Sequence, residues 1–237
     1  LYYNHSHGST EDQPQVLQSV GVTEEGTPEI WNMFMEVNQR IRENRGWEFE
    51  IPGYPYTPVN EGQILSYGDY HLETVGLKGH TYGQMGLYDR NHKVLFCADQ
   101  VIDGIVPIVG TTYPDEHLLK GYFDSLERLK HQYGDCLILP AHKEPIRDVK
   151  RVVDRIVFAY LDKTDLIKHI LDHGHHRMTT REVACLAYGI DHVPRDQSEF
   201  IKLKMVISKT FSCLEYLYDE DFAIRTLENG TYYWEAP

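Results

Sequence analysis

Four strand-like segments of this sequence each end in side chains that can bind a metal ion, and this recurrence constrains the fold more than any other feature. The strand ends carry, in chain order, His5 and His7, then His80, Asp99 and His142. Side chains just beyond strands that end at one edge of a sheet converge in space. Histidine and aspartate are ligands of Zn²⁺ and also suit Fe²⁺ or Mn²⁺. The pattern therefore predicts a sheet whose edge holds a metal site.

Each of these residues also has a purely structural interpretation. A single histidine or aspartate at a strand end commonly caps the next turn, and an isolated His-x-His pair is more often not a ligand pair. In a continuing strand, however, the rings of His5 and His7 would point to the same side, as two ligands of one ion require. The four sites occurring in this order favour metal binding over four separate caps.

Hydrophobic periodicity predicts the elements around these strand ends. Alternating or short apolar runs predict strands at 70–77, 85–88, 93–98 and 136–139, the second and third forming a hairpin. Helical spacing predicts helices at 27–43, 115–132, 147–171 and 198–218, and a short helix beginning at Thr179. A final hairpin turns at Asn229-Gly230. Strands, a helix and a further strand indicate a mixed α/β domain, and the closing helix–helix–hairpin order indicates a small winged-helix-like appendage.

Charge and composition exclude several classes of partner. Asp and Glu number 36 against 23 Lys and Arg, a formal charge of −13, so binding to a phosphate backbone is disfavoured. No apolar stretch approaches the ~20 residues that a membrane helix needs. The four cysteines are scattered without zinc-ribbon spacing. We expect them to be reduced residues, mostly in the core, of a cytoplasmic protein without a membrane partner.

The four strand-end sites together resemble the motif series of the metallo-β-lactamase-fold hydrolases. In that family, one strand is followed by HxHxDH and the next by GHTxGH, a third strand ends in GD, and a fourth ends in a histidine, as in PGH. The corresponding segments here are His5-Ser6-His7, Gly79-His80-Thr81-Tyr82-Gly83, Phe96-Cys97-Ala98-Asp99 and Leu139-Pro140-Ala141-His142.

The resemblance implies an α+β fold, the metallo-β-lactamase-like αββα sandwich, followed by a C-terminal helical or winged-helix region. Residues 1–150 would be the metal-binding domain, with a helical insert at about 27–45, and 151–237 the C-terminal region. In the family, the first sheet comes before the HxHxDH motif. Here only three residues precede Asn4, which is followed by His5. We therefore expect that this N-terminal sheet is missing from the sequence, by truncation or natural deletion, or is supplied by a partner.

The resemblance also implies one or two divalent metal ions, most readily zinc, with iron or manganese as alternatives. Ser9 and Thr10 stand where the family has an aspartate and a histidine of its second metal site. The first site keeps its ligands and the second keeps only part of them. The implied metal ligands are His5, His7 and His80 with Asp99 bridging, together with His142 in the second site.

The implied activity is that of a hydrolase. A metal-bound hydroxide would attack an ester, thioester or lactone-type small substrate, and Asp99 would be the catalytic residue that orients it. A ligand histidine needs an acceptor for its other nitrogen, and Asp103 and Glu144 are candidates. We interpret the C-terminal region as a packing or dimerisation element, which would allow a homodimer.

Aromatic side chains are candidates for the substrate pocket, namely Trp31, Phe34, Tyr56 and Tyr82. Such a pocket favours an apolar or acyl-bearing molecule, whereas the alternative is that these rings pack the insert against the core. The histidines at 173, 175 and 176 fit the end of a long helix, where the helix dipole favours them.

Two further functions stay open. The changes at Ser9 and Thr10 would also suit a catalytically impaired protein on the same scaffold, with a binding or structural role. Some relatives of this architecture are nucleases, although the acidic charge disfavours that function.

Overall fold

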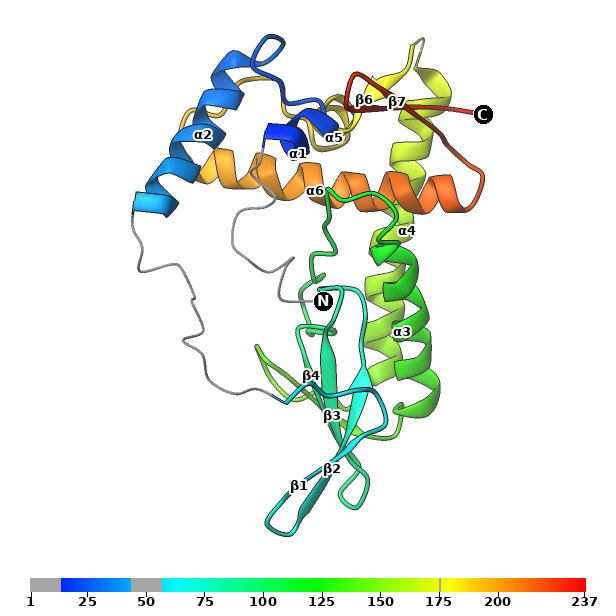
Figure 1. The fold of residues 1–237 in the computed structure, drawn as a ribbon. Coiled ribbons are helices and arrows are strands. Elements are labelled where there is room, and N and C mark those ends of the chain that lie inside the picture. The colour runs from blue at the N-terminus through cyan, green and yellow to red at the C-terminus, as the bar shows by residue number, and fades with distance from the viewer. Residues whose placement is uncertain (1–13, 44–56, 175) are drawn as a thin grey trace. The chain divides into compact units, whose positions relative to one another are not determined.

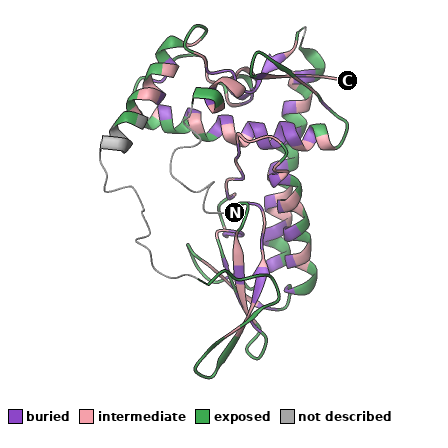
Figure 2. Cartoon of the chain, in the orientation of Figure 1, coloured by how far each residue is buried: buried purple, intermediate pink, exposed green. Residues whose placement is uncertain are grey.

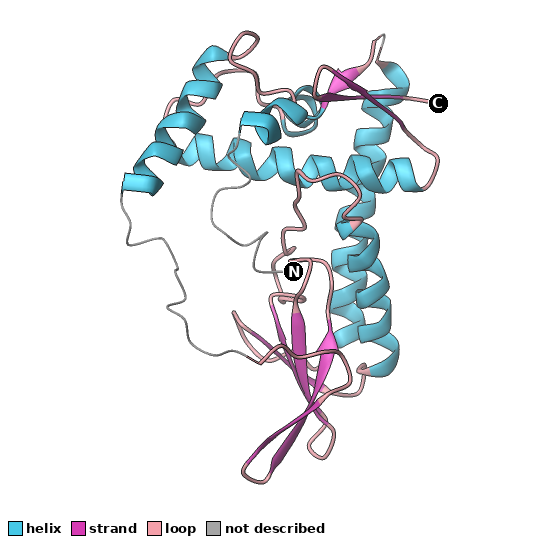
Figure 3. Cartoon of the chain, viewed as in Figure 1, coloured by secondary structure: helices cyan, strands magenta, loops and turns pink. Residues whose placement is uncertain are grey.

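A computed structural model describes residues 14–43, 57–174 and 176–237. They belong to two compact units. The sheet unit comprises Thr57–Gly110 and Glu116–Lys163, and the helical unit comprises the described residues up to 43, Thr111–Asp115 and Thr164–Pro237. Figure 1 shows the elements in chain order and Figure 3 shows them by type. The domain boundary predicted at residue 150 stays a prediction.

The sheet unit is built on a five-stranded sheet in the order β1-β2-β3-β4-β5. The strands are β1 (Ile64–Tyr67), β2 (Tyr70–Gly76), β3 (Met85–Asp89), β4 (Val94–Ala98) and β5 (Leu137–Pro140). β1 to β4 pair antiparallel in succession, whereas β5 runs parallel to β4. Strands β2, β4 and β5 therefore point the same way and end at the same edge of the sheet.

The β3–β4 hairpin that the sequence predicts is confirmed, and a side chain closes its turn. The Asp89 carboxylate accepts hydrogen bonds from the backbone N–H groups of Asn91 and His92, at 3.0 and 3.1 Å. The strand β1 was not predicted from the sequence. It is a short edge strand whose residues are mostly exposed, so it lacks the alternation that reveals a half-buried strand.

Two helices accompany this sheet. α3 (Leu118–Gln132) joins β4 to β5, since a parallel pair needs a crossover connection. α4 (Val149–His173) follows β5 (Figure 1). The helix predicted at 115–132 begins later, at Leu118, because Asp115 and His117 adopt left-handed φ angles of 65° and 50°.

The two faces of the sheet differ in their cover. On one face Leu95 lies opposite Tyr88 and Ile138, and Leu95 and Ile138 have no exposed surface. The Tyr88 ring packs edge-to-face on Tyr133, just after α3, with centroids 4.9 Å apart, so this face points toward that helix. On the other face Phe96 is 45% exposed, and its cross-strand neighbours are also apolar (Leu87 and Leu139). The second face is therefore apolar but open.

The helical unit combines four further helices with a small sheet. Its elements are α1 (Pro14–Ser19), α2 (Pro28–Glu43), α5 (Thr180–Tyr188), α6 (Gln197–Asp219), β6 (Met178–Thr179), β7 (Ile224–Glu228) and β8 (Thr231–Glu235). The strands pair antiparallel in the order β6-β8-β7. Buried residues run along most of α6, as Figure 2 shows.

Local sequence signals explain the ends of these elements. Thr179 accepts a hydrogen bond from the N–H of Glu182, whose carboxylate bonds back to the N–H of Thr179, which is a complete capping box. Asn229 and Gly230 adopt φ angles of 49° and 81° in the tail hairpin, as a type I′ turn requires. The predicted helix and hairpin are confirmed, whereas β6, of only two residues, was not predicted. The winged-helix assignment stays a prediction.

Two expectations about composition can be compared with the described residues. All four cysteines are free thiols, and Cys97, Cys136 and Cys213 are buried. Within the ranges that the structure describes, no helix has the length and apolarity needed to cross a membrane.

Adjacent residues of β4 test the difference between the two faces. Leu95→Ala removes a side chain with no exposed surface, and we expect it to lower the free energy of unfolding by about 2–5 kcal/mol. Phe96→Ala removes a larger side chain that is 45% exposed, and we expect a loss of only about 1.5 kcal/mol. Urea denaturation followed by circular dichroism measures both. An equal or larger loss for Phe96→Ala would contradict the open face.

Candidate metal centre

His80, Asp99 and His142 each lie just beyond the end of a strand. β2 ends at Gly76, four residues before His80, and β4 and β5 end one and two residues before Asp99 and His142. Because these three strands point the same way, the loops that carry the side chains share one edge of the sheet. The pairing of β4 with β5 shifts register near Ala98, which has a left-handed φ of 50°. A shift of this kind redirects the chain at a strand end.

Asp99 lies within 4 Å of both histidines. Its Oδ2 atom is 3.7 Å from Nε2 of His80, and its Oδ1 atom is 3.7 Å from Nε2 of His142. Both distances are too long for hydrogen bonds, and Oδ1 is buried without a hydrogen-bond partner. Two ligand atoms of one tetrahedral zinc ion lie roughly 3.4 Å apart. The separations are therefore close to those of side chains arranged around a metal.

The His80 ring is oriented by its other nitrogen. Nδ1 lies 2.7 Å from the backbone oxygen of Ile108. A carbonyl oxygen can only accept, so Nδ1 carries a proton, and in the neutral ring the lone pair is on Nε2, which faces Asp99. This is the arrangement found when histidine binds metals through Nε2.

The acceptor predicted from the sequence is wrong for His80, because a backbone carbonyl takes the place of Asp103 or Glu144. Asp103 instead binds two arginines of α4, with Arg151 Nη2 at 2.6 Å from Oδ2 and Arg155 Nη1 at 3.0 Å from Oδ1. The hydrogen bond from Arg151 is the main reason that the pKa of Asp103 is lowered.

The buried side-chain amide of Gln100 connects the loops of His80 and Asp99 to α3. Gln100, the residue after Asp99, has no exposed surface. Its side chain accepts a hydrogen bond from Gln84 at 2.8 Å and donates to Ser125 Oγ at 2.5 Å and to the carbonyl of Lys78 at 3.3 Å. Ser125 also donates to Lys78, at 2.7 Å. The start of the His80 loop and the residue after Asp99 thus share one set of partners.

Tyr122 of α3 contacts both loops. Its hydroxyl donates to the carbonyl of Gln100 at 2.7 Å. Its ring lies against Gly79, where an added Cβ would come within 2.2 Å of the ring carbon Cδ2. Burial is the main cause that raises the pKa of Tyr122, so the phenol stays protonated and can donate. Gly79 also has a φ of 150°, which favours glycine.

Cys97 is not a candidate ligand although it lies two residues before Asp99. Its side chain has no exposed surface, and burial raises the pKa of its thiol to about 12. Metal binding and nucleophilic attack both need the thiolate, so Cys97 is a core residue.

The fold matches solved structures over most of the chain. A metallo-beta-lactamase family protein from Thermus thermophilus matches 86% of this chain with a TM-score of 0.64 and 21% identity. A beta-lactamase domain protein from Burkholderia ambifaria matches 86% with a TM-score of 0.69 and 17% identity. The chain has the metallo-β-lactamase fold. The α+β class and the fold that the motif series implied are thereby confirmed, although no family model matches the sequence.

The chain spans only part of the length of the proteins that it matches. The structural matches cover 65% and 58% of the Thermus and Burkholderia chains. Among curated proteins, acyl-coenzyme A thioesterase MBLAC2 of Gallus gallus is 42% identical over 53 residues, which is 22% of this chain and 19% of the relative. The chain therefore matches about a fifth of the length of that curated relative.

The predicted pocket aromatics fall in different places. Tyr82, two residues after His80, is 48% exposed, and the Lys78 ammonium lies 4.5 Å from its ring centre. Trp31 and Phe34 lie on α2 in the helical unit. Phe34 is buried and packs edge-to-face on Phe200 at 4.6 Å.

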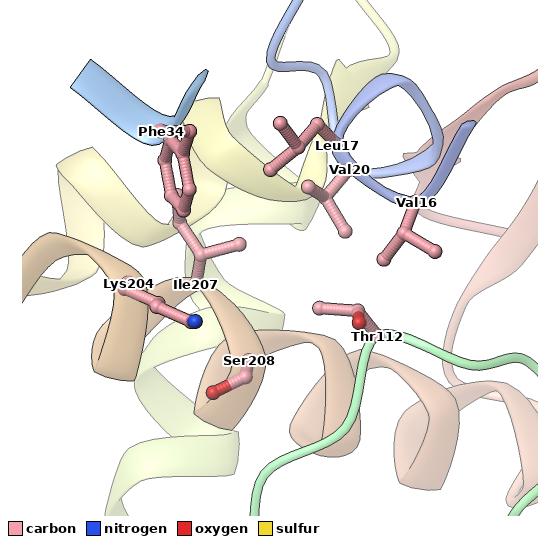
Figure 4. A pocket seen from close by; sticks show the side chains of 8 residues that line it. All are labelled: Val16, Leu17, Val20, Phe34, Thr112, Lys204, Ile207 and Ser208. Carbon is pink, nitrogen blue, oxygen red and sulfur yellow. The ribbon is translucent and has the colours of Figure 1, made fainter. Parts of the chain in front are cut away.

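Phe34 also lines a small, mostly apolar cavity of the helical unit. Figure 4 shows its ring together with side chains from α1, α6 and the segment at Thr112. The cavity measures about 20 Å³, room for roughly one water molecule. In this form it is too small for a substrate, and the role of Phe34 in substrate binding stays a prediction.

Three of the predicted site residues, His5, His7 and Tyr56, lie outside the described residues. Among the residues that are described, no group of three or more His, Cys, Asp or Glu side chains is arranged to hold a metal ion. His80, Asp99 and His142 therefore form two pairs that share Asp99, and further donors would be needed to complete a ligand set.

Gly79 tests the contact between Tyr122 and the His80 loop. We expect Gly79→Ala to lower the free energy of unfolding by at least about 2 kcal/mol, because the methyl group meets the Tyr122 ring in a backbone conformation that alanine avoids. Gly104→Ala is the control, since Gly104 also has a positive φ, of 83°, but nothing within 4 Å of an added Cβ. Its expected loss is about 1 kcal/mol. Thermal and urea denaturation measure both, and equal losses would contradict the close packing at Gly79.

Proposed function

We propose that this protein is a metal-dependent hydrolase that attacks the carbonyl carbon of an ester, thioester or lactone in a small-molecule substrate and cleaves the acyl C–O or C–S bond. The observation that carries this proposal is the Asp99 carboxylate, held 3.7 Å from a nitrogen of each of two histidines with a buried oxygen that lacks a partner. A buried carboxylate oxygen without a hydrogen bond is costly, and a cation placed among these side chains would remove that cost.

The donor set fits a divalent metal. Imidazole nitrogens with a carboxylate suit zinc best, and they also suit iron or manganese. The side chains proposed to hold one or two ions are His5, His7, His80, Asp99 and His142. A bound ion would supply Lewis acidity, which lowers the pKa of water and polarises a carbonyl group.

The protein side chains would position the reactants. Asp99 has an acceptor oxygen facing the site, so it can hold and orient a proton of the attacking water. His80 cannot turn freely, because its Nδ1 is bonded to Ile108 at 2.7 Å. His142 has a side chain that is 69% exposed, so it lies where a substrate from solution can reach it. The exposed Tyr82 ring offers an apolar surface two residues after His80.

The favoured substrate class is a thioester. The curated relative named as an acyl-coenzyme A thioesterase supports this choice, and the exposed Tyr82 ring, two residues after His80, offers an apolar surface for an acyl chain. A substrate-binding role for Trp31, Phe34 and Tyr56 stays a prediction. A nucleic-acid substrate is disfavoured by the charge of −13. A cytoplasmic location and a homodimer both remain part of this proposal.

Metal analysis tests the site directly. We expect one to two equivalents of zinc, iron or manganese in protein purified without a metal-affinity column. Asp99→Asn and His80→Gln should each weaken metal binding by at least ~10-fold, the scale found when partners of metal ligands are lost. His131→Gln is the matched control, since His131 pairs with Glu127 on the surface of α3. Elemental analysis and chelator competition measure these differences.

The same variants test the reaction. An acyl-coenzyme A thioester and a simple lactone are the first substrates, and we expect kcat/KM to fall at least ~100-fold in Asp99→Asn while His131→Gln keeps the unaltered rate. Folded protein that binds no metal and hydrolyses neither substrate would instead support the binding or structural alternative.

A further inference from the structure

The side chain of Tyr160, on α4, forms hydrogen bonds with the backbone on both sides of Ile108. Its side chain has no exposed surface. The hydroxyl donates a hydrogen bond to the carbonyl of Pro107 at 2.7 Å and accepts one from the N–H of Val109 at 2.8 Å. One phenol therefore satisfies two buried backbone groups that flank Ile108.

The contact to Val109 reaches His80 through a single peptide group. The N–H of Val109 and the carbonyl of Ile108 belong to the same planar unit. Tyr160 bonds one end of this unit, and the His80 Nδ1–H donates to the other end at 2.7 Å. Fixing the N–H therefore fixes the direction of the carbonyl. Hydrogen bonds in such a chain also polarise and strengthen one another.

We propose that Tyr160 is a positioning residue for His80. By holding the Ile108 peptide, it keeps His80 protonated on Nδ1 with Nε2 directed at Asp99. The orientation of the ring stands on the observed contacts alone, and only its consequence for metal binding rests on the proposed function. The sequence does not single out Tyr160, which lies 80 positions from His80.

Tyr122 offers a matched comparison. It is also fully buried, and its ring packs on that of Tyr160 with centroids 5.8 Å apart and planes at 76°. Its hydroxyl bonds the carbonyl of Gln100 on the Asp99 side and not the Ile108 segment. Replacing either tyrosine with phenylalanine removes one oxygen and keeps the ring. Only Tyr160→Phe frees the peptide that orients His80.

The tautomer of His80 provides the test. Nitrogen NMR of ¹⁵N-histidine-labelled, chelator-treated protein at pH 8, where an ordinary histidine is neutral, distinguishes the two tautomers, and His80→Gln assigns the signal. We expect one tautomer, protonated on Nδ1, in the unaltered protein and in Tyr122→Phe, and a mixture in Tyr160→Phe. An unchanged His80 tautomer in folded Tyr160→Phe would overturn the proposal. Unaltered signals of the other histidines report that the fold is kept.

Metal binding separates this proposal from the proposed function. We expect Tyr160→Phe to weaken Zn²⁺ binding about 10-fold in chelator competition, the lower end of the effect of losing an outer partner of a ligand. A mixed tautomer in a protein that binds no Zn²⁺ in any form would support the positioning role and overturn the metal-dependent function.

If Tyr160→Phe does not fold, 3-fluorotyrosine at position 160 keeps the hydroxyl but alters its hydrogen-bond strength. A displaced His80 Nδ1 signal would then support the proposal, and an unmoved signal would overturn it.

Discussion

The parallel pairing of β5 with β4 is the constraint on which the candidate site depends. A parallel pair needs a crossover, and α3 supplies it between the two strands. The pairing brings the loop after β5, with His142, to the same edge as Asp99. The crossover helix places Ser125 and Tyr122 next to the loops of Lys78 and Gln100. This one strand pairing therefore brings together the loops of the candidate site and the side chains that support them.

The support differs from the rest of the core in being polar. Most of the core around β4 is aliphatic, as at Leu95 and Ile138. Around the site, Gln100, Ser125 and the hydroxyls of Tyr122 and Tyr160 are buried and hydrogen-bonded instead. Apolar packing fills space without fixing backbone direction, whereas hydrogen bonds specify the angle and the atom that they join. The loops that carry His80 and Asp99 therefore have a support that fixes the direction of their backbone.

Asp99 differs from other carboxylates of the sheet unit because one of its oxygens is buried without a hydrogen-bond partner. Other carboxylates in the same unit are neutralised by close partners, such as Asp103 by Arg151 and Asp154 by Lys130. The Oδ1 atom of Asp99 is buried and has no hydrogen-bond partner. A cation bound between the two imidazole nitrogens, as we propose, would compensate this buried oxygen.

The sequence by itself determined the periodicity of most helices and strands, the capping box at Thr179, the turn at Asn229-Gly230, and the strand-end positions of His80, Asp99 and His142. Each of these follows from side-chain type and near-neighbour spacing. Only the tertiary structure decided that the Ile108 carbonyl accepts a hydrogen bond from His80, that the Tyr160 hydroxyl accepts one from the N–H of the same peptide, and that Gly79 packs closely against the Tyr122 ring. These contacts join residues from 28 to 51 positions apart, and two of them use backbone atoms, which every residue carries. A backbone acceptor leaves no mark in the sequence, so its role becomes visible only when the chain has folded around it.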